Sequence, residues 1–163
     1  MVKLIRACVN ILPKPLRELY YKYEEKWLYL FFGVLTTVVS FVSAGVAKAL
    51  LEKAGMGDFT VSSVSTVFSW LCSVTFAYIT NRLWVFDSRA SGAAEIINEA
   101  ASFYGGRVFT LVLATAIIVI GNGLFKLNYW VMKIIANVAE LILNYVISKL
   151  LVFKNGGEVG ADK

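Results

Sequence analysis

The sequence lacks histidine and has few cysteines, prolines and charged residues. It contains no His, two Cys and two Pro, and 17% of its 163 residues are charged, whereas 58% are hydrophobic. Without histidine, the chain has neither the most common general base nor the most common metal ligand. Cys8 and Cys72 form no CxxC pair and define no disulfide framework. A soluble domain has about 45–50% apolar and about 25% charged residues, so this composition argues against a soluble enzyme and favours a compact integral membrane protein.

Four hydrophobic stretches are long enough to cross a bilayer, which requires roughly 20 apolar residues in each helix. A turn with Gly55, Gly57 and Asp58 separates the first two, and only residues 126–128 separate the last two. We therefore expect an all-α polytopic membrane protein with four transmembrane helices in two hairpins, forming one membrane domain over residues 27–154. The expected spans are about 27–47, 61–86, 103–125 and 129–153.

The net charge of +5 would suggest nucleic-acid binding in a soluble protein, but here the distribution of the basic residues matters more than their sum. Under a four-span topology, twelve of the 16 basic residues lie on one side of the membrane and four on the other. Because cytoplasmic segments are enriched in Lys and Arg, we expect a multi-pass protein of the cytoplasmic membrane with both termini cytoplasmic, and no nucleic-acid partner. The twelve are Lys3, Arg6, Lys14, Arg17, Lys22, Lys26, Arg82, Arg89, Arg107, Lys149, Lys154 and Lys163, and the four are Lys48, Lys53, Lys126 and Lys133.

Residues 1–26 form a cytoplasmic segment before the first span. Apolar and aromatic residues recur there on one face of a helix, and most charged residues lie off that stripe. This pattern predicts a short amphipathic helix at the membrane interface; the alternative is a basic topology signal without such a helix. At the other end, residues 155–163 are Gly-rich and polar, and we expect a disordered cytoplasmic tail. The stripe consists of Leu16, Leu19, Tyr20, Tyr23 and Trp27.

The ends of the second and fourth spans are similar in sequence. SVTFAYITNRLWVF (73–86) aligns without gaps to ELILNYVISKLLVF (140–153), which pairs Arg82 with Lys149. The first and third spans share a weaker Phe-aromatic-Gly run at 31–33 and 103–105. Two spans in each unit would make the two hairpins parallel repeats, and the alternative is a chance match between apolar segments.

The duplication would bring Arg82 and Lys149 to the same cytoplasmic interface, with Asn81 beside Arg82 and Arg107 near the cytoplasmic end of the third span. Basic pockets between membrane helices bind phosphorylated lipids, so these residues are candidates for binding an anionic head group. The alternative is that the cations only mark the membrane edge, because long basic side chains extend to the interface in many membrane proteins.

Three polar residues share one face of the fourth span: Asn137, Glu140 and Asn144. Polar groups inside a membrane are costly and tend to serve function or helix association. Glu140 is the only acid deep in a span, and Arg107 is its nearest candidate partner. We interpret the three as a polar path for a hydrophilic group, with a packing or oligomer contact as the alternative. The sequence contains no catalytic set, metal cluster or phosphate-binding Gly-rich loop, so we expect neither an enzyme nor a bound cofactor or metal.

The spans and their closing motifs resemble the GtrA-like family. The resemblance is carried by Phe-Phe-Gly (31–33), Asn-Arg-Leu-Trp-Val-Phe (81–86) and Ser-Lys-Leu-Leu-Val-Phe (148–153), with Asn144 upstream, and covers roughly residues 27–154. One departure is visible, because Trp84 has Leu151 as its counterpart in the second repeat, where an aromatic residue is common in the family.

The resemblance implies a flippase that moves a polyprenyl-phosphate-linked monosaccharide across the cytoplasmic membrane for cell-surface polysaccharide glycosylation. It also implies a partner glycosyltransferase that forms this lipid on the cytoplasmic face. Four spans make a thin wall around a sugar, so we expect a homo-oligomer. In this hypothesis the phosphate binds Asn81, Arg82, Arg107 and Lys149, and the sugar passes Asn137, Glu140 and Asn144.

Two other functions fit parts of the sequence. The chain could be a non-transporting membrane partner of a polyprenyl-phosphate glycosyltransferase. It could also be a small proton-coupled multidrug exporter, with Glu140 as its membrane carboxylate. The small multidrug resistance family, however, has its essential acid in the first span, and residues 27–47 contain none.

Overall fold

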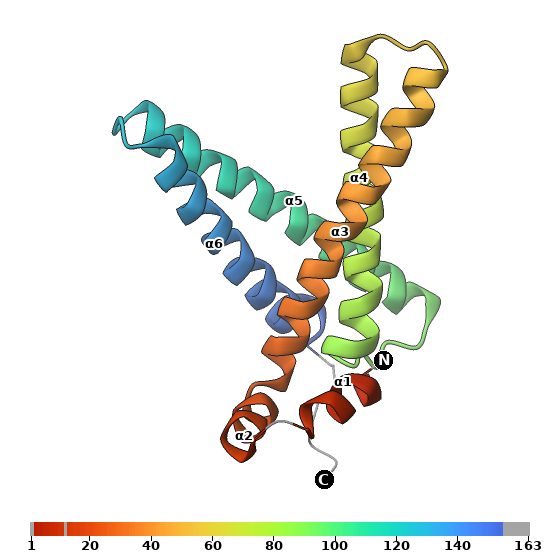
Figure 1. Cartoon of the computed structure of the whole chain (residues 1–163), viewed down its shortest axis with the longest axis vertical. Coiled ribbons are helices and arrows are strands. Elements are labelled where there is room, and N and C mark those ends of the chain that lie inside the picture. The colour runs from red at the N-terminus through yellow and green to blue at the C-terminus, as the bar shows by residue number, and fades with distance from the viewer. Residues whose placement is uncertain (1, 12, 155–163) are drawn as a thin grey trace. The chain divides into compact units, whose positions relative to one another are not determined.

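The computed structural model describes residues 2–11 and 13–154, and within these ranges it contains helices and no strands (Figure 1). Four helical segments are long and apolar enough to cross a membrane: α3, α4 with its continuation η1, α5, and α6 with its continuation η2. The prediction of an all-α polytopic protein is confirmed. The expected disordered tail, residues 155–163, lies outside the described residues. The elements are α1 (Val2–Val9), α2 (Lys14–Lys22), α3 (Glu24–Lys53), α4 (Asp58–Thr80), η1 (Asn81–Val85), α5 (Ala93–Gly123), α6 (Tyr129–Ile147) and η2 (Ser148–Val152), where η1 and η2 are π-helical.

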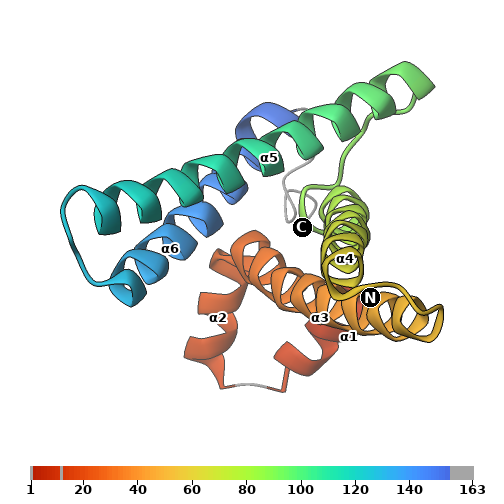
Figure 2. The ribbon, with the colours of Figure 1, turned by 90° about the horizontal axis from the view of Figure 1, so that it is seen from above.

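The chain divides into two compact units between Ser88 and Arg89. The first contains a hairpin of α3 and α4, and the second contains a hairpin of α5 and α6 (Figures 1 and 2). Each of the four expected spans overlaps one of these long helical segments.

Small residues let α4 approach α3 closely in the first hairpin. Ser65, Ser69 and Ser73 recur every fourth residue and are buried, whereas Ser62 and Ser63 are exposed. The Ser69 hydroxyl donates to the Thr66 carbonyl at 3.0 Å, and that of Ser73 donates to the Trp70 carbonyl at 2.9 Å. Their hydroxyl protons are therefore satisfied within α4 itself, which lets these small side chains be buried against α3.

The second hairpin is tight because a short turn and two close contacts hold it. The Asn128 side chain caps α6 by accepting from the backbone N–H of Trp130 at 2.9 Å, and Lys126 in the turn has a positive φ of 52°. Gly106 lies against Ile147, and Gly121 lies against Met132. These contacts fix the register of α5 against α6.

The N-terminal segment is attached to the first hairpin by an ion pair between Arg6 of α1 and Glu24 at the start of α3. Arg6 Nε donates to Glu24 Oε1 at 2.6 Å and Nη2 donates to Oε2 at 3.0 Å. This hydrogen bonding raises the pKa of Arg6 above its usual value. Nearby, burial raises the pKa of Tyr20 to about 12, so its phenol is neutral at physiological pH.

The single amphipathic stripe expected over residues 16–27 is too long. The described structure divides it at Tyr23, whose φ of −125° and ψ of 27° interrupt the helix, so Trp27 belongs to α3 and not to α2. Figure 2 shows α2 and α3 as separate helices that meet at an elbow. The position of the break fits the capture of Glu24 by Arg6, a long-range contact that helical periodicity does not reveal.

Breaking the Arg6–Glu24 pair should detach α1 from the start of α3. The Glu24 side chain is 4% exposed and that of Arg6 is 30% exposed, so Arg6→Ala leaves a buried carboxylate at a cost of about 1–3 kcal/mol, discounted for the partial exposure of Arg6. Hydrogen–deuterium exchange of residues 2–22 in detergent should become roughly tenfold faster or more. Tyr20→Phe is the control: it removes a buried hydroxyl for which the described residues provide no partner, and it should not speed exchange. Unchanged exchange in Arg6→Ala would contradict this role.

Candidate functional site

The two hairpins end in the same unusual structure. The π-helical turns η1 and η2 occupy the same positions of the aligned repeats 73–86 and 140–153. In each, the final phenylalanine donates its backbone N–H to the carbonyl five residues earlier: Phe86 to Asn81 at 2.9 Å and Phe153 to Ser148 at 2.8 Å. π-helical turns are rare and occur often at functional sites. Their occurrence at equivalent positions supports the duplication that the sequence indicates.

An aromatic pair closes each hairpin at this end. Tyr29 of α3 lies 6.3 Å from Phe86, and Phe103 of α5 lies 6.0 Å from Phe153, between ring centroids. The first hairpin has a further stack, between Phe32 and Trp84 at 5.3 Å. The counterpart of Trp84, Leu151, is exposed. The two ends are thus alike in backbone and different in surface.

Each π-helical turn carries a cation beside a tyrosine one helical turn earlier. Arg82 Nη1 donates to the Tyr78 hydroxyl at 3.1 Å. Lys149 Nζ lies 5.9 Å from the centre of the Tyr145 ring. Arg82 is half-buried, Lys149 is exposed, and Asn81 beside Arg82 is buried. The pairing of a cation with a tyrosine is therefore common to both hairpins, but the first uses the hydroxyl and the second uses the ring.

Arg107 is not paired with Glu140, for which it was the nearest candidate partner. Within residues 13–154, described without a gap, no ion pair joins the two, and the Arg107 guanidinium lies over the Phe103 ring at 5.0 Å. The register gives the reason: Gly106 faces Ile147, so Arg107 lies nearer the π-helical end of the hairpin than Glu140 does. Arg107 and Lys149 therefore lie toward the same end of the second hairpin.

The three polar residues of α6 differ in environment. Asn144 is buried and accepts from the Thr110 hydroxyl at 2.9 Å, a contact that joins α6 to α5. Glu140 is half-buried and Asn137 is exposed. The side-chain oxygen of Asn144 thus serves helix packing, which was the alternative to a polar path. Glu140 and Asn137 are more exposed on the same helix.

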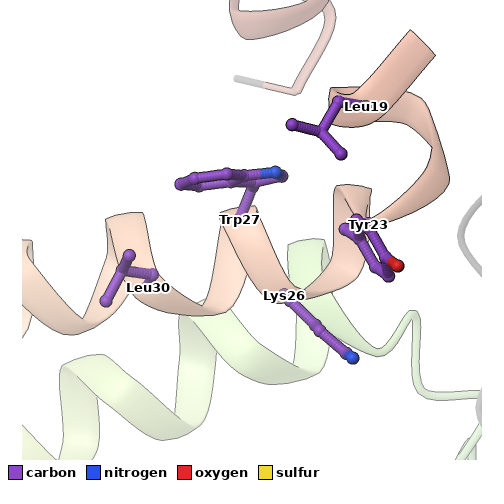
Figure 3. A pocket seen from close by; sticks show the side chains of 5 residues that line it. All are labelled: Leu19, Tyr23, Lys26, Trp27 and Leu30. Atoms are coloured by element: carbon purple, nitrogen blue, oxygen red, sulfur yellow. The ribbon is translucent and has the colours of Figure 1, made fainter. Parts of the chain in front are cut away.

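A groove that was not predicted from the sequence lies at the elbow between α2 and α3 (Figure 3). Leu19, Tyr23, Lys26, Trp27 and Leu30 line it, and its volume is about 530 Å³. The apolar stripe was the sequence feature that could have indicated this groove. A continuous helix, however, would have placed these side chains on one convex face. The break at Tyr23 turns that face into a groove.

The contact between Tyr78 and Arg82 can be tested without disturbing packing. Tyr78→Phe removes one hydrogen bond to the Arg82 guanidinium. For the phosphate site that the family resemblance implies, we expect polyprenyl phosphate to bind this variant about two- to tenfold more weakly. Tyr145→Phe is the matched control, because the ring that faces Lys149 is retained. Equilibrium binding in nanodiscs and thermal stability measure the effect and the fold. A loss that is equal in both variants would show that the tyrosines do not position the cations as the structure indicates.

The fold and these two ends define a polytopic α-helical membrane protein built from two similar hairpins, each closed by a cation-bearing π-helical turn. The chain belongs to the family described as GtrA/DPMS, transmembrane domain, which matches residues 28–153. The segment formed by α1 and α2 precedes the matched region.

Several bacterial proteins are similar over most of their length. The uncharacterized membrane protein YwcD of Bacillus subtilis is 34% identical over 133 residues, which cover 82% of this chain and 99% of YwcD. The cell wall teichoic acid glycosylation protein GtcA is 31% identical over 127 residues in Listeria monocytogenes serovar 1/2a and 34% identical over 130 residues in Listeria innocua. Both alignments cover 78% of this chain and 83% of GtcA. No solved structure matches the chain.

Proposed function

We propose that the protein moves a polyprenyl-phosphate-linked monosaccharide across the cytoplasmic membrane, where the sugar then serves glycosylation of a cell-surface polymer. The family membership and the similarity to GtcA, a teichoic acid glycosylation protein, support a part in glycosylation with lipid-linked sugars. The observation that carries the transport proposal is the pair of cation-bearing π-helical turns, one closing each hairpin at equivalent positions.

The chemistry of such a lipid fits the residues. It has an apolar chain, one anionic phosphodiester and a neutral sugar, and a protein that moves it must shield the last two from the bilayer. Arg82 and Lys149 provide the charge for the phosphodiester, with Asn81 as a hydrogen-bonding neighbour and Arg107 as a further cation on the second hairpin. Charge-assisted hydrogen bonds to phosphate oxygens are among the stronger polar contacts in proteins.

The sugar path runs along α6 in this proposal. Glu140 and Asn137 are accessible to different degrees and can accept or donate hydrogen bonds to hydroxyl groups. The Oδ1 atom of Asn144 is bonded to Thr110, so its amide nitrogen is the group that would meet the sugar.

The surroundings of the chain complete the proposal. Both termini and both π-helical turns lie on the cytoplasmic side, where a partner glycosyltransferase forms the substrate. Large apolar side chains such as Phe41, Val42 and Leu50 are exposed along α3. They face lipid or a second copy of the chain. Because four spans are few to enclose a sugar-sized path, further helices come from other copies in a homo-oligomer.

Removal of the protein from cells that modify their surface polymer tests this function against the role of a synthase partner, which would also fit the similarity to GtcA, a teichoic acid glycosylation protein. If the protein is the transporter, cells that lack it should still form the lipid-linked sugar. The lipid should then accumulate and stay inaccessible to an impermeant oxidant added at the outer surface. A fall in synthase amount or in total lipid-linked sugar would instead favour the partner role.

A further inference from the structure

A polar cavity lies between α3 and α4 near the turn that joins them, at the end of the first hairpin opposite the Tyr29–Phe86 contact. Its volume is about 360 Å³. Neither the resemblance nor the sites proposed above involve it. The polar residues that line it include Lys48 and Glu52 of α3 and Asp58, Ser62, Ser65 and Thr66 of α4. This is the hairpin end that Figure 1 shows at the loop between the two helices.

The lining is rich in hydrogen-bond acceptors and includes one charged donor, Lys48. The hydroxyl of Thr66 donates to the Ser62 carbonyl at 2.7 Å, and the hydroxyl of Ser65 donates to the Val61 carbonyl. Each hydroxyl proton is thus used inside α4, so the oxygen atoms present lone pairs. Lys48 Nζ lies 3.7 Å from Glu52 Oε1, and this pair adds both an ammonium donor and a carboxylate acceptor.

These groups select the type of ligand. Two carboxylates and one ammonium repel an anion such as a phosphate, and the hydroxyl-rich wall does not suit an apolar drug. Small-molecule sites range over about 300–1,000 Å³, so this cavity suits one sugar ring. A neutral group with many hydroxyls matches both the size and the mixed hydrogen bonding.

We infer that this cavity binds the monosaccharide of the lipid-linked substrate at the outer face of the membrane. The inference rests on the proposed function and extends it: the phosphate binds at the π-helical ends while the head group is on the cytoplasmic side, and the sugar binds this cavity only after the head group has crossed the membrane. Asp58 and Thr66 would contact sugar hydroxyls, while the prenyl chain stays in the bilayer.

The experiment measures binding to the full chain in nanodiscs. The probes are polyprenyl phosphates carrying glucose, galactose or N-acetylglucosamine, and the same polyprenyl phosphate without a sugar. Asp58→Asn and Thr66→Val should each weaken binding of the preferred sugar lipid about tenfold and leave binding of the sugar-free lipid unchanged. Ser63→Ala is the control, because Ser63 is exposed on α4 and does not line the cavity.

The outcomes separate the two proposals. If the wild-type chain binds neither the sugar lipids nor the sugar-free lipid, the proposed function itself fails, whereas equal binding of both kinds of lipid overturns only this inference. If it does prefer a sugar lipid but Asp58→Asn and Thr66→Val bind normally, the cavity holds only water and this inference is overturned. An equal loss for the sugar-free lipid would also overturn it, because the cavity would then recognise the lipid and not the sugar. Thermal stability in detergent verifies that the variants fold.

Discussion

The double variant Arg82→Ala/Lys149→Ala should lose nearly all exchange of lipid-linked sugar across a proteoliposome membrane. Both cations lie at equivalent positions of the two π-helical turns, where the proposal places the phosphodiester. A hydrogen bond to a charged group contributes about 1.5–3 kcal/mol, so each single variant should slow exchange roughly tenfold or more and the double variant roughly a hundredfold or more. The measurement is the initial exchange rate at a fixed amount of reconstituted protein.

Arg89→Ala is the matched control for this prediction. Arg89 is an exposed basic residue of the segment between the hairpins and lies outside both π-helical turns. Its loss lowers the net charge as much as the loss of Arg82 does, so it should leave exchange unchanged. Equal slowing in Arg89→Ala would show that overall positive charge is what matters. Normal exchange in the double variant would remove the phosphate site.

Gly121→Leu should destabilise the second hairpin. The space that a Cβ atom would occupy at Gly121 is already filled by Met132, whose Cγ atom would be 2.8 Å away. Met132 is buried, so a leucine must displace it and separate α5 from α6. Overpacking of this kind costs about 1–3 kcal/mol. The measurement is the thermal unfolding midpoint in detergent, together with the yield of folded protein.

Two further variants make this prediction specific. Met132→Ala combined with Gly121→Leu should recover part of the lost stability, because the smaller side chain vacates the space. Gly123→Ala should be neutral or slightly stabilising. No atom lies within 4 Å of the position that a Cβ atom at residue 123 would occupy, and alanine stabilises a helix more than glycine does. Failure of the double variant to recover, together with equal loss in Gly123→Ala, would contradict the packing that we describe.

The helical architecture was predictable from the sequence because long apolar runs leave few alternatives. Backbone polar groups in lipid must bond within their own segment, so runs of this length specify helices, and the short turn after Phe125 specifies a tight hairpin. The π-helical turns were not predictable. They differ from an α-helix only in a hydrogen-bonding pattern shifted by one residue, and this shift does not change the hydrophobic periodicity. The repeat alignment indicates only that the two hairpins end alike.

The candidate site was predictable in residue type and less so in contacts. Arg82 and Lys149 could be matched by alignment alone, but their tyrosine neighbours became evident only with the helix geometry. Arg107 was only a candidate partner of Glu140, and the two do not pair because the register of α5 against α6 depends on side-chain packing at Gly106 and Gly121. The polar cavity between α3 and α4 was not predicted from the sequence. Ser65 is buried, and it lines this cavity.

The most direct test of the central claim uses purified protein in sealed liposomes that contain a labelled polyprenyl-phosphate-linked sugar. An impermeant oxidant or enzyme measures the fraction of sugar exposed at the outer surface over time. Our account predicts that the wild-type protein brings the inner pool to the outer surface, and that Arg82→Ala/Lys149→Ala liposomes behave like protein-free liposomes. An inner pool that stays protected with folded wild-type protein would contradict transport, and copurification of a glycosyltransferase would then identify the chain as its membrane partner.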